Sequence, residues 1–339
     1  MDSCGSRNSL LSRSQLSSSL DALEAMQLKS GMIPWFHGGR ADSWNHCEAA
    51  IALAVGGRIE SSRRAADWLI QSQNRDGSWC HFYQSSGVAE PRRDTNTCCY
   101  PILLAAVLDL CLGSSIESKR YIEMALGGID YVISHQRLDG SIPWAIDPSG
   151  APNQTSLVAG SCSVYDSLSL ASGLSRSYGI GDWQRYSDSA ALLKGSLEMG
   201  SGIYQDTSDW AMDRYYPVLA GISDSGSLTG QFLDQFYQPK WGIRCLKTGD
   251  WFTAAETAEA AMALHISGEV DMSNELFFSL ERFRCEGGGY LTGLVAPNGT
   301  SFPFLEQSAY SIAAVVLAGY VVANKARPSF ASTIISLFA

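Results

Sequence analysis

The stretch Gln73-Asn-Arg-Asp-Gly-Ser-Trp79 decides the fold of this chain, because looser copies of it occur at two other places. One copy runs from Lys29 to Trp35, and the other runs from Gln136 to Trp144. In each copy a glycine-centred turn ends at a tryptophan and follows a segment with helical periodicity. A turn that recurs after helix-like segments predicts a protein built from repeats.

The repeated residues themselves have structural explanations. Gly77 permits a tight turn, Asp76 favours one, and Trp79 offers a large apolar surface to neighbouring helices. The corresponding residues of the last copy are Asp139, Gly140 and Trp144. We therefore expect these positions to be scaffold, and we expect any chemistry to lie in the segments that follow each turn.

Six segments carry small and apolar residues on nearly every face, which predicts buried helices. They begin near Asn45, Asn96, Ser163, Asp213, Glu256 and Ser308. Between them lie amphipathic segments with helical spacing, at roughly 15–28, 59–73, 117–136, 182–198, 226–238 and 272–284. This alternation predicts inner helices that are walled by outer helices.

The most apolar run of the chain, residues 312–323, lies in the last buried segment. An open solenoid needs a polar cap at its end, and this segment cannot supply one. Closure of the repeats into a ring removes that need. We therefore predict an all-α fold, an (α/α)6 toroid of six inner and six outer helices, with residues 1–339 in one domain and no strand-rich region.

The composition limits the partners and the compartment. A hydrophobic fraction of 45% predicts a sizeable core, and a net charge of −10 argues against a nucleic-acid partner or a polybasic membrane patch. The nine cysteines form no C-x-x-C pair, and the N-terminus has no apolar signal region. We expect reduced thiols, a cytoplasmic protein and no transmembrane segment, since residues 312–323 are too short to span a bilayer.

The Q-x-x-D-G-S-W element and the helix alternation resemble the repeat of the prenyltransferase and squalene-cyclase superfamily. The chain is most similar to the short single-toroid bacterial proteins labelled prenyltransferase. The segments that carry this similarity are 33–48, 210–217 and 253–259. The resemblance implies a terpenoid-cyclase-like or prenyltransferase-like enzyme that acts on an isoprenoid or similar apolar ligand in a central cavity.

The known chemistries of that superfamily are only partly matched by these residues. The D-x-D-D motif of the protonating cyclases is absent, so Asp213 at the start of the fourth inner segment is the expected general acid. Such an acid must be kept protonated by burial or by a like-charged neighbour. The zinc-dependent members use an Asp, a Cys and a distant His, whereas Asp94 and Cys98 here have the wrong spacing and no His follows at 304–310. We expect neither a metal nor a cofactor.

Polar residues open the inner helices, and helix N-termini present free N–H groups to ligands there. We predict that Asp213, Glu256 and Asp94 are catalytic. The residues that we predict to bind substrate are Asp42, Trp44, Asn45, His46, Glu48, Asn96, Tyr165, Trp210, Tyr216, Trp251, Glu306 and Tyr310. The simpler interpretation of any one of them is an ordinary helix cap or first-turn carboxylate.

Aromatic side chains beside carboxylates suit a carbocation or a sugar ring. The main hypothesis is terpenoid chemistry, with an isoprenoid or a glycosylated lipid as the small-molecule substrate and room for peripheral membrane contact. The first alternative is a carbohydrate-active (α/α)6 hydrolase, lyase or epimerase that uses paired carboxylates. The second is a non-catalytic binding toroid. The Ala, Leu, Val, Ile and Met residues of the inner helices favour the isoprenoid hypothesis.

Overall fold

The computed structural model describes the chain apart from residues 1–6, 201, 224–227, 229 and 339. The described residues form two compact units. Unit 1 comprises residues up to 27, 52–58 and 207 onward, and unit 2 comprises residues 28–51 and 59–206. Helix α2 (Ser43–Val55) begins in unit 2, and its last residues belong to unit 1.

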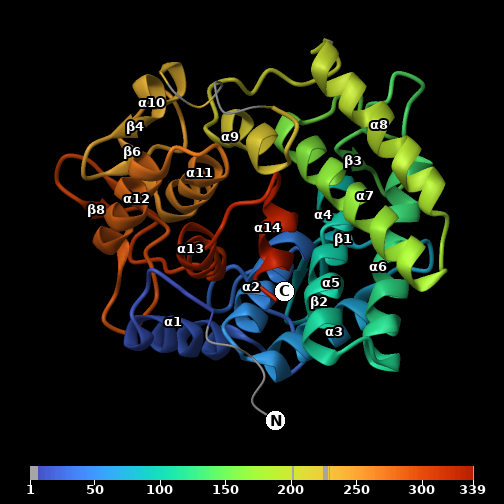
Figure 1. The fold of residues 1–339 in the computed structure, drawn as a ribbon, viewed down its shortest axis with the longest axis horizontal. Helices are drawn as coiled ribbons and strands as arrows, with labels where there is room; N and C mark the ends of the chain where they lie inside the picture. The colour runs from blue at the N-terminus through green and yellow to red at the C-terminus, as the bar shows by residue number, and fades with distance from the viewer. Residues whose placement is uncertain (1–6, 201, 224–227, 229, 339) are drawn as a thin grey trace. The chain divides into compact units, whose positions relative to one another are not determined.

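Unit 2 is built from consecutive helix pairs with a small sheet between two of them. Its further elements are α3 (Ile59–Ser72), β1 (Cys80–Gln84), β2 (Gly87–Asp94), α4 (Thr95–Cys99), α5 (Pro101–Leu112), α6 (Ile116–Ser134), β3 (Ala145–Ile146), α7 (Val158–Tyr178) and α8 (Trp183–Met199). Helix α5 packs against α6, and α7 packs against α8 (Figure 1). Within each pair the first helix is the more apolar, as the sequence predicts.

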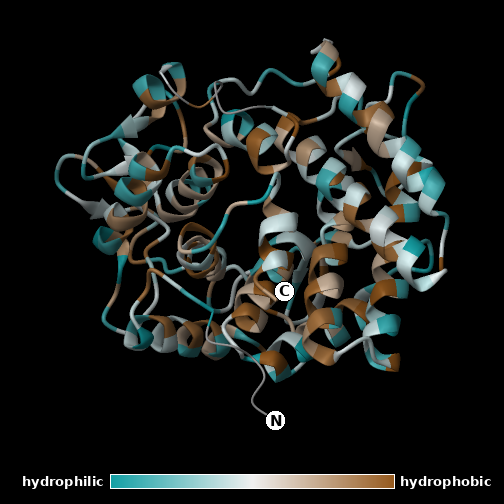
Figure 2. Cartoon of the chain, in the orientation of Figure 1, coloured by the Kyte–Doolittle hydropathy of each residue, from teal (hydrophilic) through white to brown (hydrophobic). Residues whose placement is uncertain are grey.

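The inner and outer helices of unit 2 differ in how much of their surface they bury. Every residue of α5 from Pro101 to Asp109 is buried, and much of the helix is coloured brown in Figure 2. Helix α3 buries only one face, including Trp68 and Leu69. Since each fully buried Leu, Ile or Phe stabilises a fold by about 1.5–3 kcal/mol, the inner helices carry much of the core energy.

Unit 1 joins the first helix of the chain to the C-terminal repeats. Its elements are α1 (Arg13–Met26), α9 (Met212–Leu219), α10 (Gln231–Phe236), β4 (Tyr237–Gln238), β5 (Gly242–Ile243), β6 (Trp251–Thr253), α11 (Ala254–Ile266), α12 (Val270–Ser279), the 3-10 helix η2 (Leu280–Phe283), β7 (Gly293–Val295), β8 (Thr300–Ser301), α13 (Ala309–Val322) and α14 (Phe330–Ser336). Helix α11 packs on α9, α12 and α13, and α1 packs on α13 (Figure 1). The two ends of the chain therefore share one core.

The repeated turn connects one outer helix to the next through hydrogen bonds, and we call the turn at 73–79 with these bonds the clasp. Asn74 and Gly77 close the turn, with the Asn74 N–H donating to Ser78 O at 2.8 Å. The Gln73 side-chain amide donates to Gly77 O at 2.9 Å and to Met124 O of α6 at 2.8 Å. Trp79 is fully buried, and its Nε1 donates to Leu69 O. The turn therefore holds α3 and α6 together.

Gly77 is required by its backbone angle and by its neighbour. Its φ is +90°, and a Cβ placed on it would lie 2.2 Å from Gly127 O of α6. A Cβ on Gly140 would likewise lie 2.2 Å from Leu192 O of α8, and a Cβ on Gly31 would lie 2.1 Å from Arg64 O of α3. In each copy the turn after one outer helix therefore packs on the backbone of the next.

A fourth copy of this turn lies at Cys285–Tyr290 and was not predicted from the sequence. The Cys285 N–H donates to Gly289 O, and a Cβ on Gly288 would lie 2.4 Å from Ser18 O of α1. This turn follows η2 and packs on the first helix of the chain. Within unit 1 the contact therefore links the last outer segment to the first helix.

Several expectations about the elements were wrong. Short strands form three sheets, β1-β2-β3, β4-β5 and β6-β7-β8, where we expected none that stood out. The outer helix expected at 226–238 is reduced to α10 followed by β4, and 226, 227 and 229 lie outside the described residues. The inner helix expected near Asn96 is divided into α4 and α5 at Pro101. An additional helix, α14, ends the chain.

One stretch, Thr95–Leu112, is long and apolar enough to cross a membrane by length and composition. The structure buries 83% of that stretch among its own residues. Such burial is typical of the core helix of a soluble protein. The apolar run at 312–323 likewise lies in the buried helix α13, as the sequence predicts.

The clasp predicts the effect of adding one methyl group. Gly77→Ala should lower the free energy of unfolding by about 2–4 kcal/mol, because it adds left-handed backbone strain and a clash with Gly127 O. The matched control is Gly195→Ala in α8, where no atom lies within 4 Å and φ is not positive. That control should raise stability slightly, since Ala favours helix. Equal urea-unfolding midpoints for both variants would contradict the clasp.

Candidate active site

The first polar group of unit 2 lies at the start of α2. Asp42 is 3% exposed, and it accepts hydrogen bonds from the Asn45 N–H at 2.8 Å, from Asn45 Nδ2 at 2.7 Å and from Trp35 Nε1. Burial raises the pKa of Asp42, the hydrogen bonds oppose this rise, and the charge of Asp94 adds to it. Asp42 is thus a buried, firmly oriented carboxyl group.

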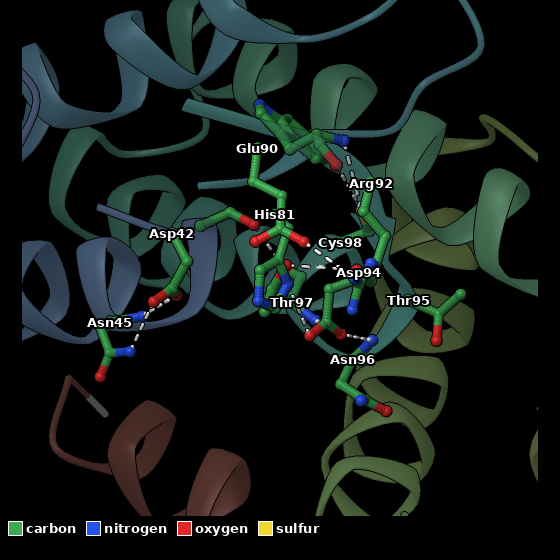
Figure 3. A network of polar contacts seen from close by, with 12 residues as sticks. Asp42, Asn45, His81, Glu90, Arg92, Asp94, Thr95, Asn96, Thr97 and Cys98 are labelled. Carbon is green, nitrogen blue, oxygen red and sulfur yellow. Dashed lines mark hydrogen bonds and ion pairs between the residues drawn. The ribbon is translucent and has the colours of Figure 1, made fainter. Parts of the chain in front are cut away.

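The second polar group lies where β2 meets α4. Asp94 accepts from the N–H groups of Asn96 at 2.9 Å and Thr97 at 3.3 Å, so it caps α4. Its other oxygen lies 3.2 Å from His81 Nδ1 of β1. Figure 3 shows His81, Asp94 and Asn96 in this network, with Asp42 and Asn45 at its side.

The starts of α2 and α4 are held together. Ser43 Oγ, next to Asp42, donates to Thr97 O at 2.9 Å. An antiparallel bridge between Ala41 and Tyr83 joins the same segment to β1. This arrangement explains why the charge of Asp94 affects Asp42, and we refer to these two predicted residues as the carboxylate pair.

Glu48 is a third buried carboxyl group, farther along α2. It is 7% exposed, and its Oε1 accepts from Trp44 Nε1 at 3.0 Å and from the Tyr100 hydroxyl at 2.9 Å. Trp44 stacks on Tyr100 with 5.0 Å between ring centroids. Burial raises the pKa of Glu48 to about 7, and the negative charge of Asp42 adds to this rise.

Four rings form a continuous aromatic row beside these carboxylates, namely Trp35, Phe82, His81 and Trp144. Neighbouring centroids are 5.5 Å apart for Trp35 and Phe82, 3.9 Å for Phe82 and His81, and 6.3 Å for His81 and Trp144. All four side chains are half-buried. The Arg40 guanidinium lies 3.9 Å from the Phe82 ring centroid and 4.4 Å from that of Trp35.

Trp35 and Trp144 correct a sequence interpretation. Alignment of the turns on their glycines places Ile33, Trp79 and Ile142 at one position, and all three are buried. Trp35 and Trp144 lie two residues later, level with His81, and are therefore not equivalents of Trp79. Trp144, expected to pack as scaffold, instead contacts His81 and Arg92. Alignment on glycine rather than tryptophan would have revealed the difference.

Unit 1 holds the other predicted catalytic residues. Asp213 is half-buried in the first turn of α9, and the Thr207 hydroxyl donates to its Oδ2. Glu256 is half-buried in the first turn of α11. The hydroxyls of Tyr215 and Tyr216 both donate to Glu259, at 2.9 Å from Tyr216. Glu259 was not singled out from the sequence.

The aromatic candidates of unit 1 include exposed rings. Trp210 is 43% exposed. Trp251 Nε1 donates to Phe302 O at 2.9 Å, and the Phe302 side chain is 57% exposed. Glu306 accepts from the Thr292 hydroxyl at 3.0 Å. Burial raises the pKa of Tyr310 on α13 to about 12.

The remaining predicted residues have less access to a ligand. His46 is fully buried, its Nδ1 accepts from the Ile33 N–H at 3.0 Å, and its Nε2 lies 3.0 Å from Ala65 O. Burial lowers its pKa to about 4, so we assign it a structural role. Asn96 is 5% exposed and lies against Gly160, whereas Tyr165 of α7 is half-buried.

The cysteines show no metal-binding geometry. The Trp79 N–H donates to Cys98 Sγ at 3.2 Å, and burial raises the pKa of that thiol well above its usual range. Among the described residues, no group of three or more His, Cys, Asp or Glu is placed to hold a metal ion. The eight described cysteines form no disulfide bond, and Cys4 lies outside the described residues.

Comparison with known proteins identifies the family. No family model matches the chain. A protein of Mycolicibacterium hassiacum described as an MMP endo-(1,4)-3-O-methyl-alpha-D-mannosidase is 32% identical over 314 residues, which cover 91% of this chain and 86% of that protein. The chain belongs to the family of this mannosidase.

Solved structures with the same fold include other sugar-acting proteins. A wild-type glycosidase matches the present chain with a TM-score of 0.69 and 11% identity. The match covers 96% of the present chain and 99% of the glycosidase chain. A D-mannose isomerase matches with a TM-score of 0.67 and 12% identity, covering 92% and 97% respectively. An α-amylase from Clostridium perfringens has a TM-score of 0.67 and 12% identity, covering 92% and 98%. The predicted α/α toroid is thereby confirmed.

The predicted family and chemistry were wrong. The mannosidase relative overturns the resemblance to prenyltransferases and squalene cyclases, together with the terpenoid enzyme and its isoprenoid substrate. Both inferences rested on scaffold features, since turns and alternating helices define a toroid without defining its site. The apolar residues that favoured an isoprenoid are largely core, as the burial of α5 and α13 shows. The carbohydrate-active alternative is the one that the comparisons favour.

The environment of Glu48 predicts a pH dependence of stability in this mannosidase-family chain. Between pH 4.5 and 7 the folded state keeps a proton that the unfolded state has released, so stability falls as pH rises through this window. Glu48→Gln keeps an oxygen that can accept from Trp44 and Tyr100, and it removes the titration. Wild type should lose about 2–3 kcal/mol of unfolding free energy relative to the variant across that window.

Urea unfolding at pH 4.5 and 7.5 measures this difference. Glu123→Gln on α6, whose side chain is 56% exposed, is the control for loss of one surface charge. Parallel stability profiles for wild type and Glu48→Gln would show that Glu48 is not held protonated by its surroundings.

Proposed function

We propose that this chain is a glycoside hydrolase that cleaves (1,4) linkages within a chain of 3-O-methyl-α-D-mannose. The observation that carries the proposal is the 32% identity to the mannosidase over 91% of this chain. The substrate is therefore a carbohydrate rather than an isoprenoid. The cytoplasmic location is part of the same proposal and is supported by the described cysteines, which are present as thiols rather than disulfides.

The carboxylate pair of unit 2 supports this chemistry. Glycoside hydrolysis generally needs two carboxyl groups, one to protonate the leaving oxygen and one to act as base or nucleophile. Asp42 has a raised pKa and three hydrogen bonds that fix its orientation, so we assign it the role of general acid. Asp94, held by two backbone N–H groups and placed beside His81, is the candidate base or nucleophile.

Glu48 is electrostatically coupled to Asp42. The negative charge of Asp42 disfavours ionisation of Glu48 and so helps Glu48 to hold its proton. Trp44 and Tyr100 keep the Glu48 carboxyl group in place. This link makes the pH dependence of turnover a property of both groups.

The sequence-based candidates of unit 1 remain part of the proposal. Asp213 and Glu256 each lie in the first turn of a helix. The helix dipole favours a negative charge at this position, so either carboxylate could stabilise its helix without taking part in catalysis. Asp213→Asn and Glu256→Gln therefore separate a catalytic role from a capping role. A loss of turnover without a loss of stability supports catalysis for that residue.

Substitution of the pair tests the proposed reaction. The substrate is a defined α-(1,4)-linked oligosaccharide of 3-O-methylmannose, and newly formed reducing ends are measured. Asp42→Asn and Asp94→Asn should each lower kcat by about two orders of magnitude or more. Asp94→Asn should change stability little, because one amide oxygen can still accept from the Asn96 and Thr97 N–H groups. Asp42→Asn replaces one of two acceptor oxygens with a donor, so its turnover is measured under conditions where unfolding experiments show the variant to be folded. Asp188→Asn, an exposed position on α8, is the matched control.

Two results would overturn the proposal. One is the absence of new reducing ends with wild-type protein, for example if free mannose is isomerised while the oligosaccharide stays intact. The other is full activity in both Asp variants, which would move the chemistry away from this pair.

A further inference from the structure

We propose that the aromatic row formed by Trp35, Phe82, His81 and Trp144 is a binding platform that recognises the O-methylated faces of successive sugar rings. The inference deepens the proposed function, on which it rests, by naming the surface that selects the substrate. None of these four residues was among the binding residues predicted from the sequence.

The row is tied to both carboxylates of the proposed pair. Trp35 Nε1 donates to Asp42, and His81 Nδ1 lies 3.2 Å from Asp94. Trp144 O accepts from the Thr95 N–H at 3.0 Å, which fixes the end of the row beside the helix that Asp94 caps. A sugar chain that lies on the row is therefore placed next to the groups that would cleave it.

The sheet β1-β2-β3 aligns the rings. Asp94 of β2 pairs with Ala145 of β3, the residue after Trp144. The pairing of β1 with β2 is irregular between Cys80 and Phe82 and again between Phe82 and Tyr83. In a regular strand His81 and Phe82 would point to opposite faces, but here their centroids are 3.9 Å apart. The bulge thus brings two consecutive rings into the same row.

The chemistry of the row matches a methylated sugar better than an unmodified one. Its rings are fixed by edge-to-face contacts, and the four residues are half-buried, so each residue retains some exposure to solvent. The Arg40 guanidinium lies over the rings of Trp35 and Phe82. The Arg92 guanidinium lies 5.4 Å from the ring centroid of Trp144. Each guanidinium is therefore placed to donate hydrogen bonds to sugar oxygens at the edge of the row. A methyl ether replaces a hydroxyl with apolar area, and burial of that area against an aromatic ring is favourable.

Trp144 is the best residue to test, because it lies in the row and no contact of its side chain with Asp42 or Asp94 is seen. Trp144→Ala should raise KM for the 3-O-methylmannose oligosaccharide about tenfold or more, with kcat within about twofold of wild type. The ratio of kcat/KM between methylated and unmethylated α-(1,4)-mannose oligosaccharides should fall toward one. Trp144→Phe keeps a flat ring and should stay within about threefold of wild type in KM.

The chain offers a matched control in the same unit. Trp183 of α8 is 39% exposed and has Arg176 5.2 Å from its ring centroid, much as Trp144 has Arg92. Trp183→Ala should leave KM and substrate preference unchanged. Trp144→Leu fills most of the same space without a flat ring, so if Trp144→Ala fails to fold, Trp144→Leu should show the raised KM instead.

Equilibrium binding, followed by tryptophan fluorescence, distinguishes failure of this inference from failure of the proposed function. If wild type cleaves the oligosaccharide and the Trp144 variants keep its KM and preference, the row is not the platform although the hydrolase stands. If wild type binds the oligosaccharide without cleaving it and Trp144→Ala loses that binding, the platform stands and the hydrolase fails. If wild type neither binds nor cleaves it, both are overturned.

Discussion

The structure depends on one close approach, the packing of a turn glycine against a backbone carbonyl of the next outer helix. At Gly31, Gly77, Gly140 and Gly288 an added Cβ would lie between 2.1 and 2.4 Å from a backbone atom of the neighbouring helix. No other residue type allows this contact without a shift of the backbone. At these four places the turn fixes how closely the neighbouring helix approaches, and the contact at Gly288 joins the C-terminal repeats to α1.

The same turns position the proposed site. Trp35 and Trp144 each lie four residues after a turn glycine, and His81 occupies the same place after Gly77. The chain then reaches the polar starts of α2 and α4, where Asp42 and Asp94 lie. Each of these three turn glycines packs on a neighbouring helix and lies only four residues before a ring of the proposed sugar-binding row. The positions of these rings therefore depend on the positions of the turns.

Sequence periodicity predicted the long elements well, since α3 (Ile59–Ser72) and α8 (Trp183–Met199) agree with the expected segments at 59–73 and 182–198. Most of the strands in the described residues escaped prediction because six of the eight are only two or three residues long, and β3 pairs with β2 although about 50 residues separate them. The fourth turn escaped because it lacks the tryptophan that ends each of the other copies. The single domain over 1–339 stays a prediction beside the two compact units.

The candidate site was only partly predictable. Asp42 and Asp94 could be found as polar residues that open buried helices, but the backbone contacts of His46 and the tyrosines that hold Glu259 depend on tertiary packing. The chemistry was misjudged because apolar inner helices were interpreted as the lining of a cavity, whereas their side chains fill the core. The proposed substrate selectivity depends on a few side chains in β1 and in the segments that follow the turns, and helical periodicity carries little information about them.

The most direct test of the central claim is a crystal structure with an uncleavable, sulfur-linked oligosaccharide of 3-O-methylmannose. The account predicts sugar rings stacked on the aromatic row, with the linking sulfur, which stands in for the scissile oxygen, within hydrogen-bonding reach of Asp42 or Asp94. An oligosaccharide bound elsewhere, with the row uncovered and both carboxylates without a sugar contact, would contradict it.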